Sequence, residues 1–459
     1  MNELFKNLKK YKSKVALIDD KLNRVDYTEL FGIKNRFKKL FPSGSIVLIL
    51  VDNSIDSISS YIGFLDLKLV KVIVDNNISK KFFKDLEKKY NPNYVICLQS
   101  KMNFLNIKGY KILNRNVCYK KLGKKKIKIN TVNSLLLTTS GSTSSPKFVR
   151  LSQLNLIDNC SKIKKYFGLT HNSRSITSLQ PAYSYAISII NSHISAGGSL
   201  IITKKNIMES KFWECFKKFK INSFYSVPIM IKYLEKIDFK ILNSDYLKYI
   251  AIAGGGLENY YLRKISKYAK KRKIKIFYMY GQTETSPRMS YLNPKYFQLK
   301  LGSIGQPLKG GKFFLKDKDG NIIKNSKRQG ELIYSGKNVC LGYANSYKDL
   351  YLGDINKGIL NTGDYAIRDS KNFYYITGRK KKISKIFGQR IDLDHLKKKP
   401  ILKKIIKDIY SNDQELFIDT FKKNKFIEAR NHVSSILKIN KLYVKRYEET
   451  YKPEFKMIK

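Results

Sequence analysis

A run of small hydroxyl residues and glycine follows a short apolar stretch in the first half of the chain. The segment from Leu135 to Val149 reads LLLTTSGSTSSPKFV, so the run ends at a proline and Lys147. Small side chains let backbone N–H groups approach an anion closely, hydroxyls add donors, and the lysine adds positive charge. The pattern favours a phosphate-binding loop, with a flexible Ser/Thr loop as the alternative. It is not a Walker A loop, because GxxxxGK[ST] is absent.

A second candidate segment, FYMYGQTET, runs from Phe277 to Thr285. Tyr280 precedes a glycine, and an aromatic ring in that position can lie flat against a nucleobase. Glu284 follows shortly after and is suited to bind a hard cation such as Mg²⁺. The alternative is a helix N-cap turn with Thr283 as the cap, and for this segment taken alone it is the simpler interpretation.

Two further segments carry a carboxylate and a cluster of cations. Asp364 ends the sequence NTGD, and GRKKKISKIFGQRI spans Gly378–Ile391. A carboxylate on a tight turn suits a diol such as ribose, and Arg379 with the following lysines suits phosphates. Taken alone, each segment is explained more simply, as a β-turn aspartate and as a solvated basic face.

The elements that must position these segments alternate between strands and helices. Ser45–Val51 is a short continuous apolar run, which is typical of a strand buried on both faces. Strand–helix–strand order at this spacing predicts an α/β fold with parallel strands. After about residue 300, glycine-containing hairpin signals indicate a smaller β-rich unit. Residues 380–459 are Lys-rich with short helical and strand patches, and GRKKKISK before them is expected to be an exposed linker. The early elements are expected at 45–51, 54–66, 70–74, 78–90 and 94–98, and the pattern recurs at 174–203 and 247–280.

The composition excludes some classes of protein. With 42% hydrophobic and 13% aromatic residues among 459, the chain can form a large core and is not globally disordered. The net charge of +54 invites a nucleic-acid or anionic-membrane interpretation, but only 14 of the 90 basic residues are Arg. Lys, Asn, Ile, Tyr and Phe are encoded by A+T-rich codons, so codon bias explains much of the charge. We therefore expect no nucleic-acid partner.

The cysteines and the apolar runs indicate a cytoplasmic protein. The five cysteines are widely separated, with no CxxC or Cys/His cluster, so neither a disulfide framework nor a zinc site is expected. The first residues lack the apolar core of a secretory signal. Apolar runs such as Ile46–Val51 fall far short of the ~20 residues that a bilayer span requires. His193, within an apolar stretch, is expected to be a core residue rather than a ligand.

In this order and spacing, the four segments resemble the core motifs of the adenylate-forming superfamily. This superfamily includes acyl-CoA synthetases, carrier-protein ligases, adenylation domains and firefly-type luciferases. AGGGLE at Ala253–Glu258 and GELIYSGKNVCLGY at Gly330–Tyr343 are also similar, as is the opening with VALID at Val15–Asp19 and DYTEL at Asp26–Leu30. The resemblance covers residues from about 15 to 395. The run from Tyr183 to Thr203 is most like a bacterial branch of undefined substrate.

The resemblance implies a two-step ligase. A carboxylic acid attacks the α-phosphate of ATP, with Mg²⁺, to give an acyl-adenylate and pyrophosphate. A thiol of CoA or of a phosphopantetheine carrier then displaces AMP. The implied architecture is an N-terminal AMP-binding domain over 1–378, made of stacked α/β subdomains plus a β-rich subdomain. A short mobile α+β lid domain follows over 379–459. The expected partners are a small carboxylic acid and, where a carrier is the acceptor, an acidic acyl-carrier protein.

Site roles follow from the positions of residues within the matching motifs. The expected loop over the β- and γ-phosphates consists of Thr139, Ser140, Gly141, Ser142, Thr143 and Lys147. The adenine and acyl cleft is expected to be lined by Gly254, Gly255 and Gly256, with Tyr280 stacked on adenine. Thr283 is expected to contact the α-phosphate, and Glu284 to bind Mg²⁺. Asp364 is expected to accept the ribose hydroxyls, with Arg379 beside it. Among the C-terminal lysines, Lys381 is expected at the hinge, Lys385 in thioester formation and Lys456 in adenylation.

Three departures from the family pattern bear on these expectations. Ser144 and Phe148 stand where the phosphate loop usually has glycine. Phe455 replaces the glycine before the adenylation lysine, so a degenerate nucleotide- or acyl-binding protein with weak or no ligase activity is the alternative. No aspartate lies near Ser184, where amino-acid-activating members pair the α-ammonium, so an α-amino acid substrate is disfavoured. The tyrosines beside Ser184 favour a small or medium acyl group.

Overall fold

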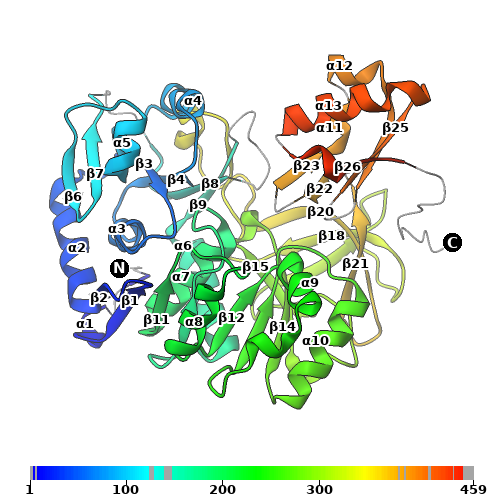
Figure 1. Cartoon of the computed structure of the whole chain (residues 1–459), viewed down its shortest axis with the longest axis horizontal. Helices are drawn as coiled ribbons and strands as arrows, with labels where there is room; N and C mark the ends of the chain where they lie inside the picture. The colour runs from blue at the N-terminus through cyan, green and yellow to red at the C-terminus, as the bar shows by residue number, and fades with distance from the viewer. Residues whose placement is uncertain are drawn as a thin grey trace. The chain divides into compact units, whose positions relative to one another are not determined.

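The structure is a computed structural model of the chain (Figure 1). It describes residues 4–5, 8–123, 129–138, 147–380, 383–386, 389–397, 399–411, 415–437 and 439–447. The chain divides into two compact units, which are described separately. The first contains residues 1–139, 144–362 and 366–376, and the second contains 140–143, 363–365 and 377–459.

An eight-stranded sheet in the first unit has four parallel strands at its centre. The strand order is β19-β9-β8-β4-β3-β5-β7-β6, and β8, β4, β3 and β5 run parallel. All six residues of β3 are buried, as expected for a strand covered on both faces. The bounds are β3 (Ile46–Val51), β4 (Val70–Asp75), β5 (Tyr94–Leu98), β6 (Lys111–Asn114), β7 (Val117–Lys121), β8 (Asn133–Thr138), β9 (Phe148–Ser152) and β19 (Gly342–Ala344).

A nine-stranded sheet forms the second layer of strands in this unit. Its order is β16-β15-β14-β13-β12-β10-β11-β1-β2, and the strands from β14 to β1 run parallel. Antiparallel strands complete both edges. The bounds are β1 (Val15–Asp19), β2 (Arg24–Asp26), β10 (Arg174–Ile176), β11 (Ser199–Ile202), β12 (Ser223–Ser226), β13 (Tyr249–Ile252), β14 (Lys275–Gly281), β15 (Arg288–Leu292) and β16 (Gln306–Pro307).

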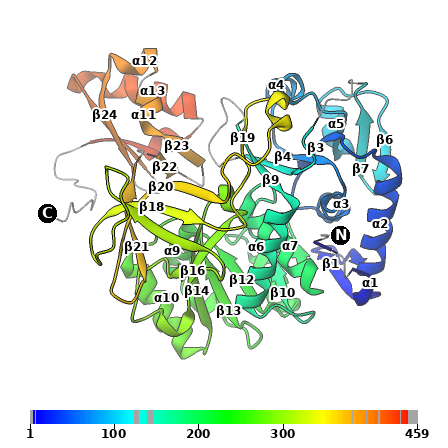
Figure 2. The same ribbon diagram turned by 180° about the vertical axis from the view of Figure 1, so that it is seen from behind.

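Helices fill the space between the two sheets and cover their outer faces. Alternate residues of β3 show this: Val47, Ile49 and Val51 belong to the central core, whereas Leu48 and Leu50 pack with residues of α4 on the other face. Figures 1 and 2 show α6 and α7 between the sheets from opposite sides. The helices of this unit are α1 (Leu8–Tyr11), α2 (Tyr27–Leu40), α3 (Ile55–Leu65), α4 (Lys80–Tyr90), α5 (Gln99–Phe104), α6 (Gln153–Phe167), α7 (Ser184–Ala196), α8 (Ser210–Lys218), α9 (Pro228–Lys236) and α10 (Asn259–Lys271).

Local sequence signals fix the ends of the central helices. Ser152 caps α6 in a reciprocal capping box with Asn155, so two otherwise unpaired groups at the helix start are satisfied. The helix α7 ends at Gly197, which has φ of +78°. A Cβ there would also lie 2.3 Å from the ring of Tyr11, so glycine is required on both grounds.

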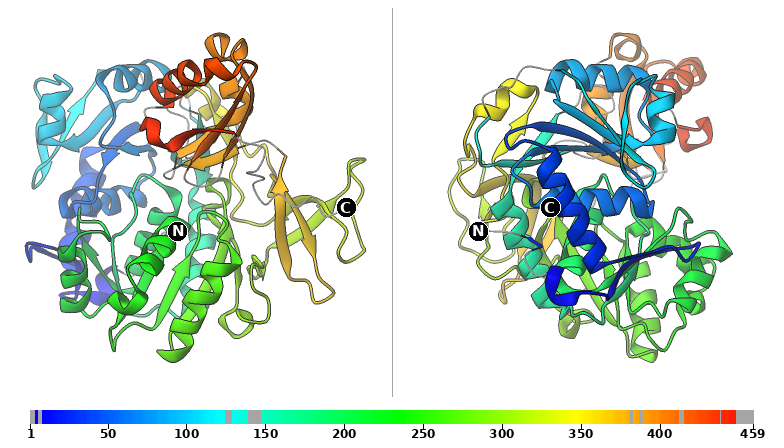
Figure 3. Two further views of the ribbon diagram at one scale, coloured as in Figure 1. Left: turned by 45° about the vertical axis from the view of Figure 1, so that its right-hand side comes forward. Right: turned by 90° about the vertical axis from the view of Figure 1, so that its left-hand side faces the viewer.

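A third, four-stranded sheet of order β17-β18-β20-β21 forms the β-rich part of the chain. Figure 3 (left) shows β20 and β21 side by side as long gold strands. Its core joins Phe313, Leu332 and Tyr334 to Met289 of the nine-stranded sheet. The bounds are β17 (Lys312–Lys316), β18 (Gly330–Ser335), β20 (Ile359–Arg368) and β21 (Tyr374–Arg379).

The second unit has an α+β structure with its own core. The core contains Leu402, Ile406, Leu416, Ile418 and Val433, which are all buried. The strands β22 (Ile383–Ile386) and β23 (Gln389–Asp392) pair with each other, and β24 (Ile406–Ser411), β25 (Leu416–Thr420) and β26 (Val444–Arg446) form a three-stranded sheet. The helices are α11 (Leu393–Lys397), α12 (Pro400–Lys403) and α13 (Phe426–Leu437).

The predicted α/β class is confirmed, and the prediction of a linker at GRKKKISK is wrong. The segments expected at 45–51, 70–74 and 94–98 are β3, β4 and β5, and the strand–helix–strand pattern at 247–280 is β13, α10 and β14. The run GRKKKISK is not simply a linker. It begins at the end of β21, and Ile383–Ile386 pairs antiparallel with β23. Backbone hydrogen bonds between the two strands form this structure, and they do not require an apolar sequence pattern.

His193 is a buried core residue, as expected, and it predicts a pH dependence of stability. The ring Nδ1 lies 3.0 Å from the carbonyl of Ile189, and burial lowers the pKa of His193 to about 4. The unfolded chain, with an ordinary histidine pKa near 6.5, binds more protons between pH 4 and 6.5. Stability is therefore lost as the pH falls through this window. From pH 7 to 5 we expect about 2 kcal/mol of this loss to come from His193.

Urea unfolding at pH 7 and pH 5 measures this dependence. The change His193→Gln should reduce the difference in unfolding free energy between the two pH values, because glutamine does not titrate. The matched control is His171→Gln at an exposed position, which should leave the difference unchanged. Equal pH dependence in the wild type and in His193→Gln would contradict the prediction.

None of the helices within the described residues is long and apolar enough to cross a lipid bilayer.

Candidate active site

A tight turn between β14 and β15 carries two of the candidate residues. A 3₁₀ turn, η2, spans Thr283–Thr285 and is capped by Gln282, so the expectation of Thr283 as the cap is wrong by one residue. Gly281 precedes it, and a Cβ there would lie 1.8 Å from the carbonyl oxygen of Pro287. Because no side chain fits, the glycine lets the chain fold back directly onto β15.

Two buried asparagines hold this turn from outside. Asn338 Nδ2 donates to the carbonyls of Thr285 and Arg288, at 2.7 and 2.8 Å. Asn159, on α6, donates to the same two carbonyls at 3.3 and 2.9 Å. Tyr334 fixes the Asn338 amide by donating to its Oδ1 at 2.8 Å. The backbone of the turn is therefore fixed by segments far away in the sequence.

Glu284 is the buried carboxylate on this turn. The residue is 5% exposed, and its Oε1 accepts a hydrogen bond from the Tyr343 hydroxyl at 2.9 Å. Its Oε2 is buried and has no hydrogen-bond partner among the described residues. A carboxylate oxygen withdrawn from water without a partner is costly, so its retention calls for a ligand. A hard cation fits this oxygen.

A lysine packs against the ring of the same tyrosine. The Nζ of Lys147 is 3.7 Å from the centroid of the Tyr343 ring. A cation over the ring face is attracted by the π electrons, so the lysine, the phenol and the Glu284 carboxylate form one chain of contacts. Lys147 is exposed and is the last residue of the predicted phosphate loop.

Thr283 contacts the start of α7. Its Oγ1 lies 3.1 Å from the Oγ of Ser184, the first residue of that helix. The next residue, Tyr185, donates its hydroxyl to the carbonyl of Ala251 at 3.1 Å, and burial raises its pKa. Ser184 therefore places Tyr183 and Tyr185, the tyrosines from which the size of the acyl group was inferred, near the 283–285 turn.

The three candidate glycines follow β13, and Tyr280 lies in β14. Gly254 has φ of +99°, and a Cβ there would lie 3.2 Å from Val227 Cγ1. Gly256 has open space around it within 4 Å. Tyr280 is half-buried, and its hydroxyl accepts from Gln282 Nε2 at 3.4 Å. Gln282 Nε2 also donates to the Thr362 carbonyl at 2.9 Å, so Tyr280 and the turn are linked to β20.

Asp364 and Arg379 meet in the second unit. Arg379 Nε lies 2.6 Å from Asp364 Oδ1, and the carboxylate side chain is 2% exposed. The predicted tight turn is wrong, because Asp364 lies within the strand β20, after Gly363 with φ of +72°. The glycine permits this backbone without ending the strand. The ion pair fixes the orientation of the carboxylate.

The remaining candidates lie outside the described residues or lack a described side chain. Lys385 lies on β22, where its backbone pairs with Arg390. The candidates outside the described part are Thr139, Ser140, Gly141, Ser142, Thr143, Lys381 and Lys456.

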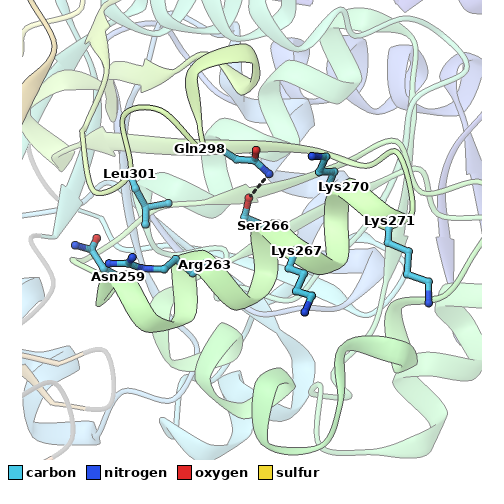
Figure 4. Close-up of a pocket in the computed structure, with 8 residues that line it drawn as sticks. All are labelled: Asn259, Arg263, Ser266, Lys267, Lys270, Lys271, Gln298 and Leu301. Carbon is cyan, nitrogen blue, oxygen red and sulfur yellow. Dashed lines mark hydrogen bonds between the residues drawn. The ribbon is translucent and has the colours of Figure 1, made fainter.

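Two features elsewhere do not join this constellation. Within the described residues, no group of three His, Cys, Asp or Glu side chains could hold a metal ion by itself. A surface hollow of about 720 Å³ lies along α10, and Figure 4 shows its lysines extending away from the helix. Gln298 Nε2 donates to Ser266 Oγ at 3.3 Å there. None of the described candidate residues lines the hollow.

A family model described as AMP-binding enzyme matches residues 4–344. The chain belongs to this family. The match includes the phosphate-loop segment, the 283–285 turn and Tyr343, so the resemblance to the adenylate-forming superfamily is confirmed, while the segments with Asp364 and Gly378–Ile391 lie beyond the matched residues.

Curated relatives match this AMP-binding enzyme over part of their length. Oxalate–CoA ligase of Saccharomyces cerevisiae is 28% identical over 264 residues, which cover 56% of this chain and 47% of the relative. Sulfoacetate–CoA ligase of Cupriavidus necator is 27% identical over 268 residues, 56% of this chain and 50% of the relative. The chain spans about half the length of the curated relatives it matches.

Solved structures share the fold of this AMP-binding enzyme over nearly its whole length. A double mutant of o-succinylbenzoate CoA synthetase (MenE) from Bacillus subtilis, bound to a product analogue, has a TM-score of 0.72 at 17% identity. It covers 98% of this chain and 95% of the synthetase. The same synthetase with an acyl-adenylate intermediate has a TM-score of 0.67 at 17% identity, covering 95% and 91%.

The sequence interpretation of this AMP-binding enzyme missed three residues of the constellation. Tyr343 and Asn338 contact the 283–285 turn, and Arg288 begins β15 beside it. The first two lie within GELIYSGKNVCLGY, which was already similar to the family, so that motif was the available signal. A single sequence gives no sign that Tyr343 and Asn338 lie beside the turn that carries Glu284, because they are some sixty residues away from it along the chain.

Proposed function

We propose that this chain activates a carboxylic acid with ATP and transfers the acyl group to a thiol. The acid attacks the α-phosphate of ATP to form an acyl-adenylate and pyrophosphate. The thiol of CoA or of a phosphopantetheine carrier then attacks the acyl carbon, and AMP leaves. Membership of the AMP-binding enzyme family and the curated CoA ligases support this reaction.

One observation carries the proposal: the buried Oε2 of Glu284 has no hydrogen-bond partner among the described residues. We propose that Glu284 holds Mg²⁺ there, together with ATP phosphates, as Mg²⁺ is commonly bound through one or two carboxylates plus phosphate oxygens. A bound Mg²⁺ would offset the negative charge of the phosphates. The Tyr343 hydroxyl fixes the other carboxylate oxygen and so orients Oε2.

The other residues position the reactants, because the attacking carboxylate needs no protein nucleophile. Thr283 would donate its hydroxyl to the α-phosphate from a backbone held by Asn338 and Asn159. Lys147 and the residues of 139–143 would bind the β- and γ-phosphates. Tyr280 would stack on adenine beside the three glycines of 254–256, and Asp364, held by Arg379, would accept the ribose hydroxyls.

Release of pyrophosphate in the presence of Mg-ATP tests the reaction. We expect release to depend on an added carboxylic acid, and a second addition of CoA to yield AMP and a thioester. A panel of short-chain, hydroxy, aromatic and dicarboxylic acids that supports no release would refute the proposal. Binding of ATP without turnover across that panel would instead indicate a degenerate binding protein.

Two lysines of the second unit should separate the half-reactions. We propose that Lys456 stabilises charge during adenylation and that Lys385 serves thioester formation. Lys456→Ala should therefore lower acid-dependent pyrophosphate release at least tenfold, while Lys385→Ala should lower thioester formation from preformed acyl-adenylate and leave the first step nearly unchanged.

Both half-reactions are measured separately for each variant. The control is Lys399→Ala, a half-buried lysine of the same unit with no proposed role. Equal and negligible effects of Lys456→Ala and Lys385→Ala would overturn the assignment of these two lysines.

A further inference from the structure

Arg288 is an almost fully buried cation with neutral surroundings. The residue is 2% exposed. Its Nε donates to the Tyr166 hydroxyl at 3.1 Å, and its Nη2 lies 3.5 Å from Ser188 Oγ. The guanidinium carbon is 4.8 Å from the centroid of the Tyr185 ring. Within the described part of the chain the guanidinium makes no ion pair.

These neutral contacts do not balance the charge. A guanidinium stays protonated at all physiological pH values and offers five N–H donors, of which the described residues engage two. Burial raises the pKa of Tyr166 to about 12, although Arg288 acts in the opposite direction, so the phenol is neutral. A buried guanidinium with most of its N–H groups unpaired is strongly destabilising, and a cation–π contact offsets a small part of that cost. The site therefore lacks an anion.

The position of Arg288 indicates where that anion would come from. Ser184 and Ser188 are four residues apart on α7, so they lie on one face of the helix about one turn, or roughly 5.4 Å, apart. Ser184 contacts Thr283, and Ser188 contacts Arg288. The guanidinium thus lies about one helical turn beyond the Thr283 hydroxyl, a distance that a short carbon chain covers.

We propose that Arg288 binds a second anionic group of the acid substrate, so that the substrate class is short diacids: acids that carry a carboxylate or sulfonate besides the carboxylate that is adenylated. This inference rests on the proposed ligase function and on Thr283 marking the α-phosphate that the reacting carboxylate attacks. Arg288 forms charge-assisted hydrogen bonds with the second anion through the N–H groups that the described residues leave unengaged. The Tyr185 ring holds the guanidinium plane from one side.

Matched pairs of acids test the substrate class with the wild-type enzyme alone. Succinate is compared with butyrate, malonate with propionate, and sulfoacetate with propionate, by acid-dependent pyrophosphate release. We expect kcat/KM for the better diacid to exceed that of its monoacid partner by at least 100-fold. Comparison of malonate with sulfoacetate shows whether the second anionic group is a carboxylate or a sulfonate. Comparison of malonate with succinate shows which spacing between the two acid groups is preferred. A preference for the monoacid in every pair would overturn the inference.

Substitution of Arg288 then assigns the preference to this residue. Arg288→Met should lower kcat/KM for the diacid at least 100-fold, mainly through KM, and change that of the monoacid less than threefold. Arg288→Lys should retain part of the preference because it keeps the charge. The control Arg272→Met removes a guanidinium from a partly exposed position, where it pairs with Asp245 at 3.5 Å, and should retain the full preference. Equal losses for both acids in Arg288→Met would overturn the inference.

The experiment separates failure of this inference from failure of the proposed function. Monoacids that support rapid pyrophosphate release while diacids do not would leave the ligase function intact and refute the role of Arg288. If no acid supports release, the ligase function fails, and the inference fails with it.

Discussion

Glu284→Gln is expected to slow acyl-adenylate formation by roughly 10²–10³-fold, a typical effect of removing one preorganised electrostatic group from a reaction centre. The substitution keeps the shape of the side chain and an oxygen that can accept from Tyr343. It removes the negative charge and replaces one carboxylate oxygen by an amide. Because the unpaired Oε2 is the proposed cation ligand, the variant should also require a higher Mg²⁺ concentration for half-maximal rate.

Two measurements check this result. Titration of ATP binding against Mg²⁺ gives a readout that does not depend on turnover, and pyrophosphate release gives the rate. Tyr343→Phe should have an intermediate effect of about tenfold, since it removes one hydrogen bond to a charged acceptor. Glu214→Gln, at an exposed position of α8, should behave as the wild type. Wild-type rate and Mg²⁺ dependence in Glu284→Gln would exclude Glu284 as the ligand.

The second large effect is on stability, because Arg150 is a fully buried cation that binds backbone carbonyls. Its guanidinium donates to the carbonyls of Leu341, Tyr343, Leu352 and Gly353 at 2.7–3.2 Å, and to Asn133 Oδ1 at 3.3 Å. Methionine fills similar space but leaves these acceptors unpaired inside the protein. We expect Arg150→Met to lower the free energy of unfolding by roughly 3–5 kcal/mol.

Urea unfolding measured by circular dichroism checks this value. Arg150→Lys should lose less, because the ammonium can still donate to some of the carbonyls. Arg272→Met, which removes a guanidinium from a partly exposed position, should change stability by less than about 0.5 kcal/mol. A loss below about 1 kcal/mol in Arg150→Met would mean that water or a rearranged loop satisfies the carbonyls.

Strands with a continuous apolar sequence could be predicted from the sequence. Contacts between side chains far apart in the sequence could not. The strand β3 is apolar throughout because both its faces are covered, so its sequence alone identifies it. The turn at 283–285 was found through its glycine and its glutamate. The partners of Glu284 were not found, because Tyr343 approaches it through the pairing of β19 with β9.

Asp364 and Arg288 show two other limits of sequence interpretation. The NTGD sequence has strong turn residues, yet β20 continues through it, since pairing with its neighbours in the sheet outweighs the local preference of Gly363. Arg288 looks like an ordinary surface residue among 90 basic ones. Its burial becomes visible once α6 and α7 are placed against β15, because Tyr166 and Ser188 come from those helices.

The hydrogen bonds from Arg150 to the carbonyls of residues 341–353 affect where the chain can be truncated. The family match ends at residue 344, yet two of the carbonyls that Arg150 binds belong to Leu352 and Gly353. A fragment cut at the family boundary would sever half of these contacts. A cut shortly after Gly353 would keep all the Arg150 contacts within the N-terminal fragment but would remove β20 and β21 from the four-stranded sheet, whereas cleavage just before Leu341 would separate β19 and, with Tyr343, the contact to Glu284.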